Sequence, residues 1–260
     1  MTTLADPSAL QTLLYEVRDR VAYIVINRPN ARNALSPVVL DELVRTTDWA
    51  VADQSVKAIV IRGSGDKAFS AGVDLKYFKE HGMVGDVGAH LLFTAKLRDT
   101  LIKIEKTPLP VIAVVQGFAL AGGLELALAC DFILCSDTCQ IGDQHANYGL
   151  MAGGGGTQRL PRMIQPMEAL QMLLKGDAID LTKAKSLGIV GAVVPAADLI
   201  KASKEWIKAG GKAVAPWDEK GFKLPGGPVF SKMGMQMFPA GNAIYRRETY
   251  DNYPAARAIM

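Results

Sequence analysis

The sequence predicts a mixed α/β fold, because short apolar runs alternate along the chain with longer segments of helical periodicity. Ala58–Arg62 and Val111–Val115 are runs of mainly Val, Ile and Ala, which are typical of buried strands. Pro37–Val51 and Val87–Glu105 carry apolar residues at helical spacing instead. Strands separated by helices or long connections favour an α/β protein over a β-sandwich.

The composition fits one large α/β domain with an appendage. The chain has 260 residues, of which 49% are hydrophobic and 21% charged, with a net charge of +3. No basic run interleaved with aromatic residues indicates a nucleic-acid partner. No apolar run approaches the roughly 18 residues of a membrane span. The N-terminal segment lacks a basic region followed by an apolar one, so we expect a cytoplasmic protein.

In the N-terminal half, the pattern predicts a hairpin, a helix, a strand and a long helix. The hairpin turns at Asp19 and Arg20, and Ser36 is the expected cap of the first helix. The predicted ranges are Leu14–Arg18, Val21–Asn27, Pro37–Val51, Lys57–Arg62 and Val87–Glu105, the last with Leu91, Leu92, Leu97, Leu101 and Ile104 on one apolar face.

In the C-terminal half, strands and helices continue to about residue 209. The predicted strands are Val111–Val115, Phe132–Ser136 and Val190–Val194, and the predicted helices are Thr157–Ile164, Glu168–Lys175, Leu181–Leu187 and Ala197–Ala209. Beyond residue 210, Gly and Pro, including Pro239 and Gly241, are expected to break up helices. We therefore expect a domain over residues 1–200 and a helical to irregular appendage over 201–260, for packing or oligomerisation.

Two segments place a small-residue turn between a predicted strand and a predicted helix. Gly117–Glu125 follows the strand Val111–Val115, and Lys67–Lys76 follows Ala58–Arg62. Such turns leave backbone N–H groups free at a helix start, and glycine lets a ligand oxygen approach them closely. Two turns that supply one N–H each commonly build an oxyanion hole.

A third segment, Gly149–Arg162, is a glycine run that opens a helix. Glycine runs that open a helix can bind phosphate, but no Lys-Ser or Lys-Thr follows these glycines, so the segment is not a P-loop. Arg159 and Arg162 are expected to bond carbonyls or acids beside this glycine run.

These three segments, together with Ile26–Leu35, resemble the motifs of the crotonase superfamily, the enoyl-CoA hydratase/isomerase proteins, over about residues 14–200. The resemblance implies a spiral of ββα units and an acyl-CoA thioester as substrate. It implies that the N–H groups of Val73 and Gly122 hold the thioester oxygen. It also implies a homotrimer or hexamer, with no cofactor beyond the coenzyme A of the substrate. The implied substrate-binding residues are Arg28, Arg32, Ala71, Asp74, Leu75 and Lys76.

The resemblance implies two catalytic positions, and the chain departs from the family at one of them. Hydratases of this family carry two glutamates that hold one water, and Glu125 stands at the first position. At the second, this chain has His145. Asp143, two residues away, does not match the register. Glu125 is interpreted as a general acid/base or else as a helix-start carboxylate. His145 is interpreted as a second acid/base, a partner that orients water, or a structural histidine.

The sequence therefore favours hydration of a 2-enoyl-CoA through a stabilised enolate, as in fatty-acid β-oxidation. The alternatives are another acyl-CoA reaction and a non-catalytic acyl-CoA-binding relative. The other reaction would be double-bond isomerisation, or carbon–carbon bond hydrolysis in which His145 activates water. A purely structural assembly protein is disfavoured, because both turns with free N–H groups are present.

The tail and the cysteines complete the expectations. Residues 216–227 resemble the connector after the hydratase part of multifunctional β-oxidation proteins, and the acidic, aromatic closing segment of single-function hydratases is missing. Cys130, Cys135 and Cys139 are an odd number without a matching histidine pair, so free thiols are favoured over disulfides or zinc. His81 and His90 are expected to be exposed.

Overall fold

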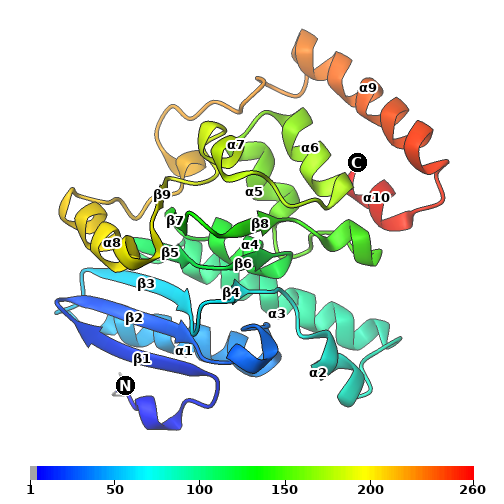
Figure 1. Ribbon diagram of the computed structural model, residues 1–260. Helices are drawn as coiled ribbons and strands as arrows, with labels where there is room; N and C mark the ends of the chain where they lie inside the picture. Colours follow the sequence, from blue (N-terminus) through cyan, green and yellow to red (C-terminus); the bar gives the residue numbers. More distant parts are fainter. Residues whose placement is uncertain (1–4) are drawn as a thin grey trace.

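The computed structural model describes residues 5–260, in which two β-sheets are enclosed by helices (Figure 1). The larger sheet has six strands in the order β1-β2-β3-β5-β7-β9, and the smaller has three in the order β4-β6-β8. All strand pairs are parallel except β1 with β2. The predicted α/β class is confirmed.

The larger sheet contains every strand that the sequence predicted. Its hairpin turns at Asp19 and Arg20, whose φ angles of 53° and 63° are typical of a two-residue turn between antiparallel strands. Parallel strands follow one another from β2 to β9, so most of this sheet is buried. The strands are β1 (Leu13–Arg18), β2 (Val21–Ile26), β3 (Ala58–Gly63), β5 (Val111–Val115), β7 (Phe132–Ser136) and β9 (Ala192–Val194).

The smaller sheet was not predicted, and it is the part of the fold that positions the candidate site. It consists of β4 (Ala68–Ser70), β6 (Phe118–Leu120) and β8 (Gln140–Gly142). Three residues are too few to show the alternation that identifies a strand. Because the three strands are parallel, their carboxyl ends lie at the same edge of the sheet.

Ten α-helices occur within residues 5–260, and none of them is long and apolar enough to cross a membrane. Ser36 caps α1 as predicted, since its Oγ accepts a hydrogen bond from the Val39 N–H at 3.4 Å. The helices are α1 (Pro37–Ala52), α2 (Leu75–Glu80), α3 (Val87–Glu105), α4 (Gly122–Leu128), α5 (Gly156–Met163), α6 (Pro166–Lys175), α7 (Leu181–Ser186), α8 (Leu199–Lys208), α9 (Lys232–Thr249) and α10 (Pro254–Ile259).

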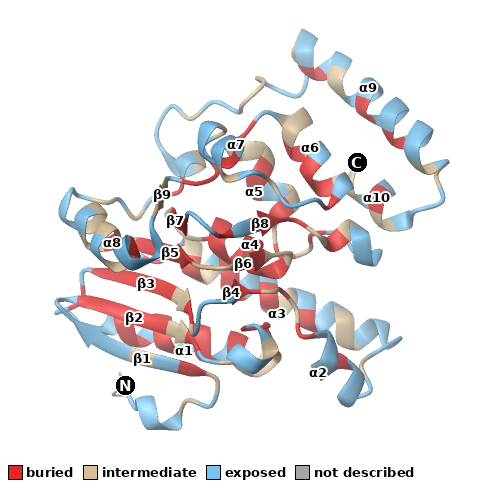
Figure 2. Ribbon diagram, viewed as in Figure 1, coloured by how far each residue is buried: buried red, intermediate tan, exposed pale blue. Residues whose placement is uncertain are grey.

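The main core lies between the sheets and helices α1, α3 and α4, and a smaller cluster lies between the larger sheet and α8 (Figure 2). One prediction about α3 is wrong. Leu91 and Leu92 are 67% and 75% exposed, although they share the predicted apolar face. Only the later turns of α3, from Phe93 onward, contribute buried side chains to the core. The first turns lie beside the surface helix α2.

The prediction that Gly and Pro interrupt the tail is also wrong in part, since α9 runs through both Pro239 and Gly241. A proline inside a helix costs about 3 kcal/mol. Two features offset this cost: Ser231 caps the helix, and α9 packs on α6, where a Cβ at Gly241 would lie 3.0 Å from Leu170. The division at residue 200 stays a prediction; α8 crosses it and packs on β5 and β7.

Candidate functional site

Three turns leave the same edge of the smaller sheet and meet there. The turn after β4 contains Gly72 and Val73, the turn after β6 contains Ala121 and Gly122, and the turn after β8 leads from Asp143 into the short 3₁₀ helix η3 (His145–Tyr148). The second turn opens α4, whose first turn carries Glu125. Every catalytic and N–H position expected from the sequence is therefore on one of these turns or on α4.

The first two turns are in contact. A Cβ at Gly72 would lie 3.0 Å from the Leu120 carbonyl oxygen and 3.1 Å from the Gly122 nitrogen. Ala121 adopts φ 49° and ψ −120°, a backbone conformation that a residue with a side chain rarely adopts and that marks strain at functional turns. Within residues 5–260, neither the Val73 N–H nor the Gly122 N–H donates to a protein acceptor. Both amides thus stay available to a ligand oxygen.

Glu125 is a fully buried carboxylate with one unused oxygen. Its relative exposure is 0%, and its Oε1 accepts a hydrogen bond from the Gly156 N–H at 2.9 Å. Its Oε2 is buried and has no hydrogen-bond partner among the described residues. Burial raises the pKa of Glu125, and the charge of His145 together with the Gly156 N–H offsets this only in part. Such a carboxyl suits proton transfer near neutral pH.

His145 faces Glu125 across a short gap. Its Nε2 lies 3.7 Å from Glu125 Oε2, too far for a direct hydrogen bond, and the residue is 6% exposed. Burial alone would lower the pKa of His145, but the hydrogen bond that its Nδ1 makes to Asp143 and the charges of Glu125 and Asp143 outweigh burial, so the pKa of His145 is raised. The structure brings together the two residues expected to be catalytic.

Asp143 joins this pair, although its position does not match the register of the family's second glutamate. It is fully buried, and its Oδ1 lies 2.7 Å from His145 Nδ1. Residues two apart in an extended strand share a face, but here the chain leaves β8 and turns into η3, which brings the two side chains together. An acid two residues before a histidine, directly after a glycine, was the available signal.

Arg159, on α5, holds the glycine run between η3 and α5 in place through hydrogen bonds. Its Nη1 donates to the Gly154 carbonyl at 2.9 Å, and its Nε donates to Glu105 Oε2 at 2.6 Å. Arg162 Nη1 donates to the Gln158 carbonyl at 2.6 Å. The expectation that these arginines bond carbonyls or acids is confirmed. The run ends at Gly156, whose N–H binds Glu125.

The residues expected to bind coenzyme A surround the turn after β4. Arg28 pairs with Asp74 at 2.7 Å and also donates to the Ala34 carbonyl, while Asp74 caps α2. These two side chains therefore hold the turn as well as lie beside it. Arg32 and Lys76 are exposed, and Lys76 lies 3.6 Å from Glu80. Leu75 is exposed and Ala71 half-buried.

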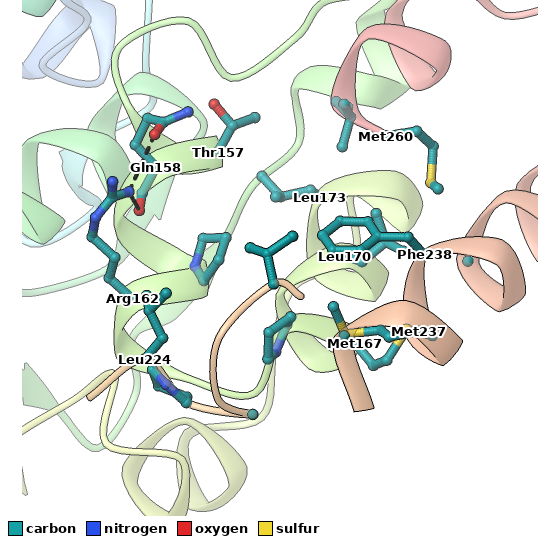
Figure 3. Close-up of a pocket in the computed structure, with 18 of the residues that line it drawn as sticks. Thr157, Gln158, Arg162, Met167, Leu170, Leu173, Leu224, Met237, Phe238 and Met260 are labelled. Carbon is teal, nitrogen blue, oxygen red and sulfur yellow. Dashed lines mark hydrogen bonds between the residues drawn. The ribbon is translucent and has the colours of Figure 1, made fainter. Parts of the chain in front are cut away.

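Two cavities border helix α5, which follows the glycine run. One, of about 470 Å³, borders the glycine run and is lined by Met151, Gly154, Arg159 and Trp217 among others. The other, of about 460 Å³, lies between α5, α6, α9 and α10 and is mainly apolar, with Met167, Leu170, Met237 and Phe238 in its wall (Figure 3). Arg162, hydrogen-bonded to Gln158, is its charged lining residue. Glu125 and His145 line neither cavity.

The three cysteines are free thiols, as the sequence favoured; Cys135 and Cys139 are buried and Cys130 is half-buried. Among the described residues, no group of three His, Cys, Asp or Glu side chains could hold a metal ion. His81 is exposed as expected, whereas His90 is half-buried with its ring edge-on to Phe78.

Two sheets of mainly parallel strands with their helices make a mixed α/β fold, and comparison with solved structures shows that this is the crotonase fold. The enoyl-CoA hydratase/isomerase family model matches residues 16–215. The chain belongs to the enoyl-CoA hydratase/isomerase family.

The most similar relatives include two bacterial hydratases. A probable enoyl-CoA hydratase of Mycobacterium bovis is 38% identical over 190 residues, covering 73% of this chain and 71% of the relative. A crotonyl-CoA hydratase of Syntrophomonas wolfei is 35% identical over 205 residues, covering 76% and 74%.

Solved structures show the same fold. An enoyl-CoA hydratase from Bacillus anthracis superposes with a TM-score of 0.72 at 33% identity, covering 76% of each chain. An enoyl-CoA hydratase/isomerase from Xanthobacter autotrophicus superposes with a TM-score of 0.73 at 29% identity, covering 96% of this chain and 86% of that one. The second comparison extends into the C-terminal helices.

Proposed function

We propose that the protein adds water to a 2-enoyl-CoA thioester. The observation that carries this proposal is the unused Oε2 of the fully buried Glu125, on the helix that Gly122 opens, together with two backbone amides that have no protein acceptor within residues 5–260. The amides of Val73 and Gly122 hold the thioester oxygen. Their hydrogen bonds increase the electrophilicity of Cβ and stabilise the negative charge that the oxygen gains in the enolate.

The gap between Glu125 and His145 holds the attacking water. The water oxygen bonds to Cβ while one of its protons passes to the Glu125 carboxylate, and the electron pair of the double bond moves toward the thioester oxygen. The imidazolium of His145 then gives its Nε2 proton to Cα, which completes the 3-hydroxyacyl-CoA. Proton transfer from Glu125 to the neutral Nε2, relayed by the next water that enters the 3.7 Å gap, restores the starting state.

The coenzyme A would lie over the turn after β4. Arg32 and Lys76 are the exposed basic side chains there, and they are free to approach its phosphates. Arg28 and Asp74 contribute by holding the turn, through the ion pair between them. The homotrimer or hexamer, the cytoplasmic location and the place in β-oxidation stay predictions.

The proposal is tested by following the ultraviolet absorbance of a 2-enoyl-CoA, which disappears when the double bond is hydrated. We expect turnover by the wild-type protein and formation of 3-hydroxyacyl-CoA, identified by mass. A panel of chain lengths is needed because the acyl preference is open. Binding of the panel without any turnover would instead support a non-catalytic acyl-CoA-binding protein.

The Asp143–His145 pair favours a second candidate, hydrolysis of a carbon–carbon bond next to a ketone. An imidazole whose other nitrogen bonds a carboxylate can activate water for attack on a carbonyl carbon. Assays on 3-oxoacyl-CoA and 2-enoyl-CoA distinguish the two candidates, and a 3-enoyl-CoA tests double-bond isomerisation. His145→Glu should raise hydration if the site is hydratase-like. If His145→Ala abolishes cleavage while His145→Glu leaves hydration unchanged, the second candidate replaces the first.

A further inference from the structure

We propose that Asp143 is a positioning residue that keeps the proton of His145 on Nδ1 and directs Nε2 at Glu125. The inference deepens the proposed function and rests on it where catalysis is concerned. The placement of the proton, however, is a property of the free protein. It can therefore be measured whether or not the protein is a hydratase.

The hydrogen bonds around Asp143 fix the tautomer. Asp143 Oδ1 accepts from the backbone N–H of His145 at 3.3 Å and lies 2.7 Å from its Nδ1. An ionised carboxylate can only accept hydrogen bonds, so Nδ1 must carry the proton. In the neutral imidazole, Nε2 is then the acceptor, and in the cation it is a donor. In both states it is Nε2 that faces Glu125.

Among the described residues, the Asp143 side chain forms hydrogen bonds with His145 alone. Its side chain is 1% exposed, and its Oδ2 is buried without a partner in the described part of the chain. No lysine or arginine within residues 5–260 forms an ion pair with it. A buried carboxylate that is left with a single partner is costly, so a purely structural role would be served better by an apolar side chain. The His145 ring is what Asp143 acts upon.

The charged groups around the ring come from four elements. Asp143 reaches it from the end of β8 and Glu125 from α4, while Arg159 of α5 affects Glu125 through its charge. Helix α6 also packs against η3. Its Glu168 pairs with Lys183 at 2.7 Å, and its Lys175 is exposed. Asp143 and Glu125 are thus the charges nearest to the imidazole.

This arrangement favours the imidazolium over the neutral imidazole. Carboxylates on both sides of the ring raise the pKa of His145 despite its burial. The cation directs its Nε2–H across the gap to Glu125 Oε2, which has no other partner among residues 5–260. A water there can accept from Nε2–H and donate to the carboxylate. His145 then supplies the proton that Cα receives in the proposed reaction.

The test uses ¹⁵N NMR of histidine-labelled protein without substrate. The chain has three histidines, so His81 and His90 are internal references for His145. In the wild type we expect a titration midpoint for His145 above 6.5 and a neutral form protonated at Nδ1. Asp143→Asn should lower that midpoint by about 1–2 pH units, because an opposite charge is lost. Asp131→Asn, which neutralises a half-buried aspartate instead, should leave the His145 midpoint unchanged.

Catalytic pH profiles complete the test. The alkaline limb of kcat should move to lower pH in Asp143→Asn together with the NMR midpoint, while Asp131→Asn keeps the wild-type profile. Asp143→Glu, which can still accept from Nδ1, should restore part of the activity lost in Asp143→Asn. A purely packing role for Asp143 would lower activity without moving the limb.

The outcomes separate the two proposals. The inference is overturned if the neutral His145 of the wild type carries its proton on Nε2. It is also overturned if Asp143→Asn leaves the titration midpoint of His145 unchanged. The tautomer is measured on the wild type, so that result does not depend on whether a variant folds. A shifted midpoint with an unmoved alkaline limb also overturns it as a statement about catalysis. If the midpoint and tautomer are as expected but no 2-enoyl-CoA is turned over, the proposed function fails, whereas the positioning of His145 stands.

Discussion

Glu42 and Glu125 are both buried glutamates, but they differ in the number of hydrogen bonds they accept and in the direction in which their pKa is shifted. Glu42, on α1, accepts hydrogen bonds from the N–H groups of Gln11, Thr12 and Leu13 and from the Thr12 hydroxyl. Although burial acts to raise its pKa, these bonds outweigh the effect and lower it. Glu125 receives one N–H, from Gly156, and its pKa is raised.

The difference separates a carboxylate that stabilises the fold from one that is kept reactive. Glu42 ties the segment before β1 to α1, and its charge is satisfied. Glu125 keeps one oxygen without a partner in the described chain, so its ionised form is costly. Burial alone therefore does not identify a reactive acid. The number of donors around it does.

The strongest test of this comparison is catalytic. Glu125→Gln keeps the shape and the bond from Gly156 but removes the base, so kcat should fall by about 10²–10⁴. Acyl-CoA affinity, measured by calorimetry, should be nearly unchanged. Glu42→Gln is the matched control and should keep wild-type kcat. Equal activity of wild type and Glu125→Gln would mean that Glu125 is structural.

A second variant adds bulk beside the reactive carboxylate without changing any charge. A Cβ at Gly156 would lie 2.7 Å from Asp143 Oδ2 and 3.4 Å from Glu125 Oε1. Gly156→Ala should push the two carboxylates apart and lower kcat by about 10²-fold, since a displacement near 1 Å has that effect. Gly88→Ala is the comparison for glycine loss, because Gly88 is exposed on α3 and an added Cβ there would meet only Asp86 Oδ1, at 3.3 Å; steady-state kinetics on both variants measures the difference.

The third test concerns stability and pH at Glu42. Glu42→Gln should lower the free energy of unfolding by about 2 kcal/mol near pH 7, because hydrogen bonds to a charged group contribute roughly 1.5–3 kcal/mol. The folded pKa of Glu42 lies below the unfolded value of 4.5, so its contribution is present above pH 4.5 and is lost as pH falls through the folded pKa. Urea titrations should show the gap between wild type and variant closing in acid. A gap that widens in acid contradicts the account.

The smallest expected effect has the opposite sign. The folded pKa of Glu125 lies above the unfolded value of 4.5. The ionised carboxylate therefore lowers the free energy of unfolding as the pH rises from 4.5 through the folded pKa, and it does so fully above that pKa. Glu125→Gln should therefore unfold at an equal or slightly higher urea concentration than wild type at pH 7, and at the same concentration below pH 4. A clear loss of stability at pH 7 would show that Glu125 contributes to folding as Glu42 does.

The sequence could predict the elements that carry their own pattern. The hairpin at Asp19 and Arg20, the cap at Ser36 and the bounds of α3 and β5 follow from local turn chemistry and periodicity. Glu125 and His145 were found through their place in family motifs. The structure then placed them 3.7 Å apart.

What could not be predicted depends on contacts between distant segments. Strands β4, β6 and β8 are three residues each and exist because they pair with one another. The role of Asp143 depends on how the chain bends between β8 and η3, which spacing alone does not reveal. Helix α9 continues through Pro239 because capping and packing on α6 outweigh a local preference.

The smaller sheet makes the chemistry modular. Each of its three parallel strands delivers one turn to the same edge: the first two bring backbone amides, whose chemistry does not depend on side-chain identity, and the third brings Asp143 and His145. In the proposed reaction, substitutions after β8 therefore change the acid–base group without altering the two amides proposed to hold the thioester. If the proposed roles hold, the fold keeps the substrate-binding amides on two turns and His145 on a third, so the reaction on one class of substrate can change through substitutions in a single loop.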